Sequence, residues 1–235
     1  MSEQVAVVVG VGPGLGFALA RRFAAGGMRV VLAARRKEAV EALLAKEPLP
    51  GALVQPCDAT RKDDVAQLFE VVERDLGPPS LVAFNAGAFR PGSVLDIEPD
   101  DFVRCWEVGC LAGFLVAQAA AKRMVPAGRG TILFTGATAA LRGSANFANL
   151  AVPKFGLRAL AQSLARELGP RGIHVGHVII DGQILSERHR HLEDQRGPDS
   201  LLEPDAIAEM YWQLHLQPRS TWTHELDLRP WSEKF

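Results

Sequence analysis

Residues 5–27, VAVVVGVGPGLGFALARRFAAGG, decide the fold of this chain. They open with VAVVV, an apolar and mostly β-branched run that predicts a buried strand over 5–9. The segment 14–26 then has the apolar spacing of a helix. Gly10, Gly14 and Gly16 lie at the junction, where they let the backbone turn tightly and approach a bound group. Because the first N–H groups of a helix, including that of Leu15, are free donors, the junction predicts a phosphate site. A tight turn without a ligand is the alternative.

The rest of the chain repeats this alternation of strand and helix. The apolar runs predict further strands at 29–33, 52–57, 80–85, 131–135, 173–180 and 225–230. Helical spacing predicts helices at 37–46, 61–76, about 100–125, about 149–168 and 204–216. Near-continuous apolar strands separated by helices indicate a parallel sheet covered on both faces. The fold class is therefore α/β, a doubly wound parallel sheet (Rossmann fold), in a single domain over 1–235.

The composition narrows the class of protein. The chain has 235 residues, 48% of them hydrophobic and 23% charged, which is typical of a globular domain with one sizeable core. A net charge of −1 favours neither a nucleic acid nor an anionic membrane as partner. The three cysteines lack metal-ligand spacing, and their odd number fits a reducing compartment. The N-terminus has no basic stretch before its apolar run, so neither a signal peptide nor a membrane span is predicted. We expect a cytoplasmic protein with a small-molecule substrate.

The end of the second strand carries information about the nucleotide. A site that prefers NAD(H) usually places an acidic side chain there, to bind the ribose 2′-hydroxyl. This chain has Arg35 and Arg36 instead, and a guanidinium pairs well with a 2′-phosphate. The sequence therefore favours NADP(H), with NAD(H) as the second choice. Two solvated arginines at the start of a helix are the alternative.

Several further motifs resemble the short-chain dehydrogenase/reductase family over nearly the whole length of the chain. The spacing Gly10-x-x-x-Gly14-x-Gly16 is similar to that family's glycine loop, and GTILFTGATAALRG (130–143) and KFGLRALAQSLARELGPRGIHV (154–175) resemble its fifth strand, long helix and sixth strand. The resemblance implies that Asp58 meets the adenine ring. It also implies that Asn85, Ala86 and Gly87 stabilise the sheet and line the cofactor, and that Gly182, after the sixth strand, lies on the cofactor side.

The same resemblance makes the catalytic positions unusual. The family uses an asparagine, a serine, a tyrosine and a lysine; the corresponding residues here are Gly109, Ala137, Leu150 and Lys154. The enoyl-reductase branch places its tyrosine seven residues before the lysine, where this chain has Phe147. Only the lysine is retained. Its implied role is to hold the nicotinamide ribose, and a plain exposed lysine is the alternative.

Other polar residues near these positions are candidate substitutes for the missing acid. The candidates near the site are Thr135, Thr138, Ser144, Asn149, His177 and Asp181. For each of them an ordinary packing or capping role is the stronger interpretation. Tyr211 is the one tyrosine of the chain and, with Trp212, is expected in the core or a pocket wall. A metal is rejected, because His189, His191, Glu193 and Asp194 lack a second cluster to complete a ligand set.

Two segments are expected to depart from a regular pattern. Pro153 would remove a helix hydrogen bond if the helix ran through it, so we predict that residues 146–152 leave the usual helix path, with a helix starting near Asn149 or Val152. The charge-rich segment 186–203 follows the sixth strand, where a ligand crevice is expected. It is a candidate lid over the substrate, or else a solvated loop.

Three functions remain open. The first is an NADP(H)-dependent oxidoreductase with a divergent active site, which transfers hydride to or from a small carbonyl-type substrate. The second is an inactive dinucleotide-binding pseudoenzyme with a structural or regulatory role, and the third is a non-redox lyase or isomerase. The resemblance also implies a homodimer or homotetramer formed through the helices at about 100–125 and 149–168.

Overall fold

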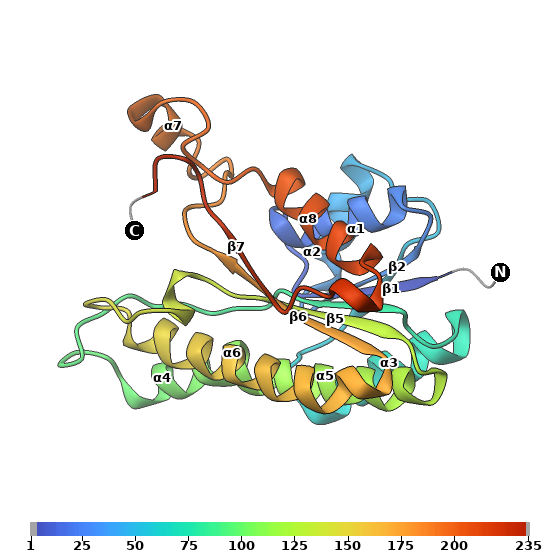
Figure 1. Ribbon diagram of the computed structural model, residues 1–235. Coiled ribbons are helices and arrows are strands. Elements are labelled where there is room, and N and C mark those ends of the chain that lie inside the picture. The colour runs from blue at the N-terminus through green and yellow to red at the C-terminus, as the bar shows by residue number, and fades with distance from the viewer. Residues whose placement is uncertain (1–3, 234–235) are drawn as a thin grey trace.

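The β-branched runs of the sequence form the strands of one seven-stranded sheet, in which each strand is parallel to its neighbours (Figure 1). The computed structural model describes residues 4–233, so the ends 1–3 and 234–235 of the expected domain lie outside the described residues. The strand order is β3-β2-β1-β4-β5-β6-β7. The strands are β1 (Val5–Val9), β2 (Arg29–Ala34), β3 (Leu53–Pro56), β4 (Leu81–Phe84), β5 (Gly130–Thr135), β6 (Ile173–Ile180) and β7 (Glu225–Leu228). The predicted fold class is confirmed.

Helices cover both faces of the sheet, which explains why its strands are apolar on both sides (Figure 1). Helices α3, α5 and α6 pack on one face, and α1, α2 and α8 pack on the other. The helices are α1 (Leu15–Ala25), α2 (Lys37–Lys46), α3 (Lys62–Leu76), α4 (Pro99–Trp106), α5 (Ala112–Met124), α6 (Ala148–Leu168), α7 (His191–Arg196) and α8 (Pro204–Leu216). Short helical turns are η1 (Glu107–Leu111, π-helical), η2 (Val125–Ala127), η3 (Thr138–Ala140), η4 (Gly169–Arg171) and η5 (Arg219–Thr221).

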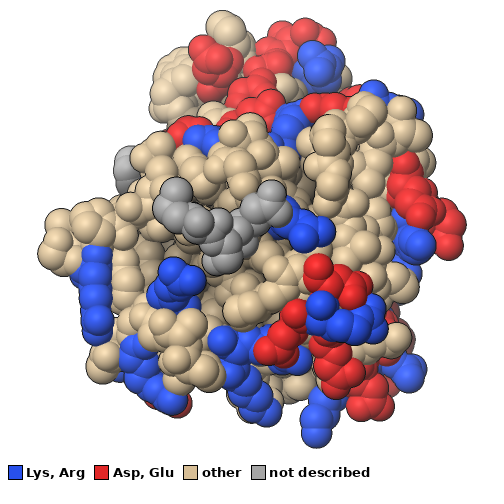
Figure 2. Space-filling model, turned by 90° about the vertical axis from the view of Figure 1, so that its right-hand side faces the viewer, with Lys and Arg blue, Asp and Glu red and all other residues tan. Residues whose placement is uncertain are grey.

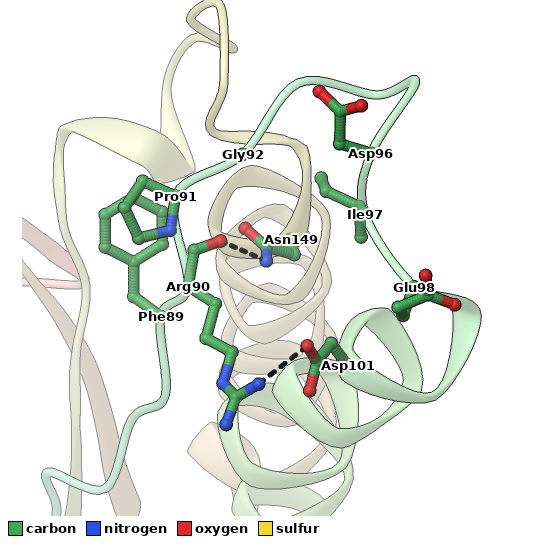
Figure 3. A pocket seen from close by; sticks show the side chains of 9 residues that line it. All are labelled: Phe89, Arg90, Pro91, Gly92, Asp96, Ile97, Glu98, Asp101 and Asn149. Carbon is green, nitrogen blue, oxygen red and sulfur yellow. Dashed lines mark hydrogen bonds and ion pairs between the residues drawn. The ribbon is translucent and has the colours of Figure 1, made fainter.

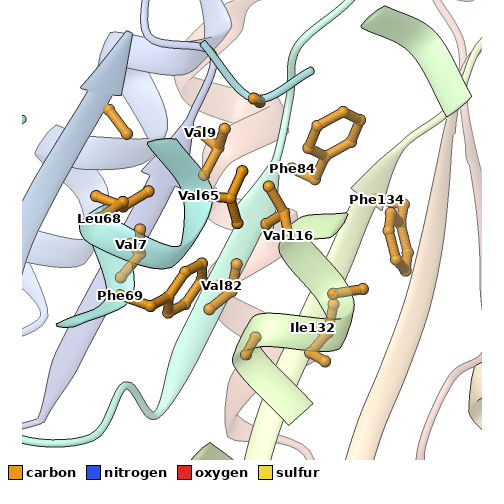
Figure 4. Packing of buried hydrophobic residues seen from close by; sticks show 14 of the residues in the cluster. Val7, Val9, Val65, Leu68, Phe69, Val82, Phe84, Val116, Ile132 and Phe134 are labelled. Carbon is orange, nitrogen blue, oxygen red and sulfur yellow. The ribbon is translucent and has the colours of Figure 1, made fainter. Parts of the chain in front are cut away.

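The alternation of β1 divides the core into two layers. Val7 and Val9 point to the layer under α3, α5 and α6, where they join Val82, Phe84 and Phe69 (Figure 4). Ala6 and Val8 point to the opposite layer, under α1 and α8. Full burial of a valine or phenylalanine side chain contributes about 1.5–3 kcal/mol, so both layers stabilise the sheet.

The order of the strands locates the ligand crevice. The chain moves outward from β1 to β2 and β3, then returns to place β4 on the other side of β1. In doubly wound sheets a ligand binds beyond the carboxyl ends of the strands at this reversal. The glycine loop after β1 and the segments after β4 and β5 therefore meet at one edge of the sheet.

The predicted helix at 100–125 is divided into three parts. The π-helical turn η1 separates α4 from α5, and propensity alone does not distinguish a π turn from an α turn. Among the described residues, the stretch Pro99–Ala127 is long and apolar enough to cross a membrane by length and composition, with 44% of its apolar window buried inside the protein. Val116, Ala117 and Ala120 of this stretch pack against the sheet, as in a core helix.

The expectation for the region before Pro153 was correct for the start of the helix and for residues 146–147, and wrong for residues 148–152 and for the place of the proline. The helix begins at Ala148, close to the predicted Asn149, but residues 148–152 are helical and Pro153 lies inside α6 rather than in its first turn. Because five helical residues precede the proline, its missing N–H leaves only one helix carbonyl, that of Asn149, without its usual donor.

The segment 186–203 is more ordered in secondary structure than a plain loop. It contains the short helix α7, and Leu202 pairs with Ile184 in an isolated parallel bridge. Its function as a lid stays a prediction.

Charged side chains of both signs share the surface. On the face drawn in Figure 2, lysine and arginine are interspersed with aspartate and glutamate, and no single sign dominates. Elsewhere ion pairs join different elements, such as Arg123 with Glu73 and Arg158 with Glu225.

Candidate functional site

Two glycines of the loop are required by its packing. Gly10 has a φ of 92°, and a Cβ there would lie 2.5 Å from the backbone nitrogen of Ala86. A Cβ on Gly16 would lie 2.7 Å from the carbonyl oxygen of Gly10. A side chain at either position would therefore separate α1 from the strand ends. These two glycines shape the loop whether or not a ligand is bound.

Gly12 and Gly14 differ, because they face open space. A Cβ at either residue would meet no heavy atom within 4 Å. Gly14 is the N-cap residue of α1, and Leu15 is the first residue of the helix. The first turn contains no acidic residue that would neutralise the helix dipole. The N–H groups of Leu15 and Gly16 donate to no other described residue, whereas that of Phe17 donates to Gly12 O and Gly14 O (both 3.1 Å). The open space and the free donors fit a diphosphate, as the sequence predicts.

The motif Asn85-Ala86-Gly87 joins β4 to the glycine loop. The backbone N–H of Asn85 donates to Val9 O (2.8 Å), and its side-chain amide donates to Gly10 O (3.1 Å). Ala86 packs against Gly10, and Gly87 is exposed with open space around its Cα. The stabilising role implied by the resemblance is visible in these bonds, while the cofactor contact of Ala86 and Gly87 stays a prediction.

Asp58 has internal partners. Its Oδ1 accepts hydrogen bonds from the backbone N–H (3.1 Å) and the hydroxyl (2.7 Å) of Thr60, and Arg104 lies 3.6 Å from Oδ2. Burial alone would raise the pKa of the Asp58 carboxyl, but the Thr60 bonds and the charges of Arg104 and Arg35 lower it overall. The ionised carboxylate therefore orders the turn after β3. Contact with adenine is an additional expectation.

Arg35 and Arg36 end the neighbouring strand β2 and precede α2. Both side chains are exposed, and neither forms an ion pair with another described residue. They are thus positioned at the carboxyl edge of the sheet with their guanidinium groups available to an anion.

Lys154 is buried, which excludes the interpretation as a plain exposed lysine. Its side chain reaches from α6 to the end of β5, where Nζ donates to the carbonyl oxygen of Thr135 at 2.6 Å, and the residue is only 7% exposed. Burial lowers the pKa of Lys154 to about 8. An ammonium group held at the end of β5, at the carboxyl edge of the sheet, fits a polar group of a bound nucleotide.

Tyr211 does not replace the missing tyrosine. It is fully buried in the layer under α8, and its hydroxyl is hydrogen-bonded to Thr135 Oγ1 (2.8 Å). Burial raises the pKa of Tyr211. Lys154 contacts the carbonyl of Thr135 from the opposite face of the sheet, and a carbonyl carries no proton to pass on. The expectation that Tyr211 and Trp212 belong to the core is confirmed.

The asparagine position is closed to any side chain. Gly109 lies in η1 against α6, and a Cβ there would be 2.9 Å from Pro153 Cβ. The glycine at position 109 and the proline inside α6 are therefore sterically coupled. Sequence reasoning missed this coupling, because forty-four positions separate the two residues and only the packing of η1 on α6 brings them together.

The other polar candidates have structural partners. Thr138 Oγ1 donates to Asp181, which is 1% exposed and lies 3.2 Å from Arg229. His177 is fully buried, with Nδ1 3.4 Å from Glu225 Oε2, and burial lowers its pKa to about 4. A histidine that is neutral at pH 7 and lies behind the backbone of Gly136 is not positioned as an acid. Ser144 is exposed, and Asn149 is buried beside a different pocket.

The segment after β6 approaches the glycine loop. A pocket of about 310 Å³ is lined by Pro13 and Gly14 on one side and by Leu185, Ser186 and Arg190 on the other. Gly182 lies at the start of this segment with a φ of 148°, and a Cβ there would be 2.7 Å from Pro230 Cδ, so the packing of the C-terminal tail explains this glycine. No group of three or more potential metal ligands, including those at 189–194, is assembled within residues 4–233.

Comparison with known proteins decides the family. A family model described as short chain dehydrogenase matches residues 4–196. The chain belongs to this family. Its members are oxidoreductases that bind NAD(P), and this matches the glycine loop and the open helix N-terminus described above.

Relatives and solved structures agree with this assignment. The chain is 30% identical over 189 residues to 3-oxoacyl-[acyl-carrier-protein] reductase MabA of Mycobacterium avium (80% of this chain, 70% of that one). It is 32% identical over 182 residues to 3alpha-hydroxysteroid dehydrogenase of Mediterraneibacter gnavus (76% and 73%). A short-chain dehydrogenase structure from Rhodopseudomonas palustris has a TM-score of 0.83 at 38% identity (97% and 99%). A metagenomic short-chain oxidoreductase in complex with NADP has a TM-score of 0.82 at 28% identity (97% of both chains).

Proposed function

We propose that this chain is an NADP(H)-dependent oxidoreductase that transfers hydride to or from a small carbonyl-type substrate without the family's tyrosine. The observation that carries the proposal is Lys154, a buried cation held at the end of β5, at the same edge of the sheet as the open helix N-terminus at Gly14. Burying an ammonium group without a carboxylate partner lowers the stability of the folded protein. A role in binding would account for the presence of Lys154 at this position. Bound NADP(H) would supply the hydride.

The residues of this chain divide the binding of NADP(H) among them. The N–H groups at Gly14, Leu15 and Gly16 would hold the diphosphate, and Lys154 would hold the ribose next to the nicotinamide. Arg35 and Arg36 would pair with the 2′-phosphate. The structure of the metagenomic relative in complex with NADP supports this choice of nucleotide.

The missing acid limits the range of substrates. A positioned acid or base contributes about 10²–10⁴ in rate, whereas orientation alone supplies roughly 7–11 kcal/mol. Leu150 and Ala137 provide neither a proton nor a hydrogen bond to a developing oxyanion. The site therefore suits an acceptor that needs little protonation, and slow turnover of ordinary ketones is expected. The segment 186–203, which reaches the glycine loop, would close over such a substrate.

A second candidate function is a dinucleotide-binding protein without turnover. The observation that favours it is the complete separation of Tyr211 from the site, since no other phenol exists in the chain. Such a protein would bind the nucleotide with the same residues and serve a structural or regulatory role.

Titration with NADPH and NADH by nicotinamide fluorescence, followed by turnover assays on carbonyl, enone and imine panels, separates these functions. Lys154→Ala should weaken NADPH binding and lower any rate, because the ribose loses its cation. Lys122→Ala, which removes an exposed lysine of α5, is the matched control. Saturable NADPH binding without turnover on any panel would support the binding protein, and absence of NADPH binding would exclude both functions.

The choice of nucleotide has its own test. Arg35→Asp should raise the NADPH dissociation constant about tenfold to a hundredfold and leave that of NADH equal or lower, because a charged hydrogen bond to the 2′-phosphate is lost. Arg171→Asp alters an exposed arginine in η4, before β6, and should change neither constant. An unchanged ratio of the two constants in Arg35→Asp would remove the arginine argument.

A further inference from the structure

A second pocket opens beside the first turn of α6, away from the glycine loop. It has a volume of about 400 Å³ and lies between the segment after β4 and the start of α4 (Figure 3). Arg90 is the one cation of its lining, and its guanidinium is paired with Asp101 at 2.7 Å. Asp96 and Glu98 also line the pocket and form no ion pair with another described residue. The pocket wall therefore carries a net negative charge.

Asn149 adds an unpartnered acceptor to this wall. The residue is 1% exposed, and its side-chain amide stands between Arg90 on one side and Ile97 and Glu98 on the other (Figure 3). Its Nδ2 donates to the carbonyl oxygen of Arg90, whereas its Oδ1 has no hydrogen-bond partner. A buried amide oxygen without a donor is destabilising, and a ligand N–H would satisfy it.

Phe89 gives the pocket an aromatic side. Its ring is 38% exposed and packs against the ring of Phe147, with centroids 4.7 Å apart. The contact with Phe147 holds the Phe89 ring in place at the pocket. The face of an aromatic ring attracts a cation, and more strongly when the cation is partly desolvated.

We propose that this pocket binds the protonated primary amine of a small ligand. Asn149 favours an N–H donor, and Asp96 and Glu98 favour a positive charge; the Phe89 ring lies across Asn149 from these two carboxylates, where it would contact another part of the ligand (Figure 3). An anion would be repelled, and a neutral alkyl group would leave the amide oxygen unsatisfied. Within residues 4–233 no three metal-ligating side chains are assembled, so a metal ion lacks its ligands here.

The position of the pocket connects it to the proposed substrate site. Asn149 immediately precedes Leu150, the residue that the resemblance places at the family's tyrosine position. That the ligand is the substrate rests on the proposed function. The binding of the amine does not.

The test uses the full chain and three probes of similar size: n-butylammonium, butyrate and 1-butanol. Nitrogen-15 NMR titrations should show saturable shifts by n-butylammonium, centred on the amides of 89–98 and Asn149, and weaker or no shifts by the other two probes. Asp96→Asn and Glu98→Gln should each weaken binding about threefold and together about tenfold. Asp100→Asn, an exposed carboxylate of α4 outside the pocket lining, should have no effect.

Three results would overturn the proposal: no saturable binding of n-butylammonium at any concentration tested, equal binding of 1-butanol, or full affinity in the Asp96→Asn/Glu98→Gln variant. Titration of the same variants with NADPH keeps the two proposals apart. If NADPH binds and the amine does not, only the amine site fails. If the amine binds and NADPH does not, the pocket stands without the proposed function.

Discussion

The resemblance places Leu150 at the position of the family's catalytic tyrosine, and it implies differences at three further positions of the catalytic region. Gly109 leaves no room for an asparagine because Pro153 occupies that space, and Ala137 replaces the serine. If the resemblance holds at these positions, a tyrosine introduced at residue 150 would lack the serine and the asparagine of the family's catalytic set.

The contact between Gly109 and Pro153 gives a prediction about stability. Gly109→Ala should lower the free energy of unfolding by about 1–3 kcal/mol, because the new Cβ overlaps Pro153 Cβ. In a Pro153→Gly background the same change should cost at least about 1 kcal/mol less. Urea unfolding of the four proteins of the cycle measures this coupling. Gly143→Ala, at an exposed glycine with open space, should stay within about 0.5 kcal/mol; equal costs in both backgrounds would disprove the coupling.

The buried ammonium of Lys154 predicts a dependence of stability on pH. Burial lowers its pKa from 10.5 to about 8, so the unfolded chain holds this proton more tightly than the folded protein between these values. The stability of the folded protein should therefore rise with pH through this window, by about 3 kcal/mol at most, and the gain should be lost as pH falls through 8.

Lys154→Met isolates this contribution. The difference in unfolding free energy, native protein minus Lys154→Met, should increase between pH 8 and pH 10 in urea titrations without nucleotide. The same difference for Lys122→Met, at an exposed position, should be flat. A flat difference for Lys154 as well would mean that its amine is solvated.

At the scale of elements, the sequence predicted regular helices better than interrupted ones. The bounds of α2 and α8 agree with the predicted 37–46 and 204–216, and α8 has Pro204 in its first turn and Pro218 just beyond its end. The helix at 100–125 failed as a unit because η1 depends on close packing against α6. The prediction that Pro153 lies in the first turn of the helix failed for the same reason. The helix accommodates this proline because Gly109, which packs against it, has no side chain.

The residues of the candidate site also fall into two groups: those that local sequence predicts, and those whose placement depends on tertiary contacts. The glycines of the loop after β1 and the segment after β4 could be predicted from the sequence, because the local backbone geometry requires these residue types. The burial of Lys154, the pairing of Tyr211 with Thr135 and the enclosed His177 could not, since each depends on elements distant in the chain.

His177 of β6, which lies near Glu225 of β7, makes the stability of the folded protein sensitive to acid. Burial lowers the pKa of His177 from 6.5 to about 4, although Glu225 opposes part of this shift. The neutral ring is favoured in the folded state, so its contribution is complete above pH 6.5 and is lost as pH falls toward 4. We expect the native protein to lose up to about 3 kcal/mol across this range from His177 alone.

His177→Leu tests this expectation with a side chain that does not titrate. The loss of unfolding free energy between pH 6.5 and pH 4 should be smaller in His177→Leu than in the native protein, as measured by urea unfolding at each pH. His191→Leu changes an exposed histidine of α7 and should leave the profile as it is. An unchanged acid profile in His177→Leu would assign the loss to other groups.

For the whole molecule, the face of the sheet that is covered by α4, α5 and α6 carries a set of exposed apolar side chains. Val103 and Trp106 of α4, Phe114 of α5, and Val152 and Phe155 of α6 are 39–49% exposed. These three helices lie together on one face of the sheet (Figure 1). Apolar patches of this kind mark association surfaces in soluble proteins, and we expect a homodimer or homotetramer formed through α4, α5 and α6.

Phe155→Glu should separate such an assembly, because a carboxylate would be buried against apolar side chains of the partner without a counter-ion. Size-exclusion chromatography with light scattering should give a multiple of the 25.4 kDa chain mass for the native protein and a smaller mass for Phe155→Glu. Leu216→Glu places the same charge at a residue that is 54% exposed on α8, across the sheet, and should leave the mass unchanged. A monomeric native protein, or an intact assembly in Phe155→Glu, would exclude this surface. Since α6 also carries Asn149 and Lys154, loss of the assembly should be accompanied by weaker NADPH binding only if the interface fixes the position of that helix.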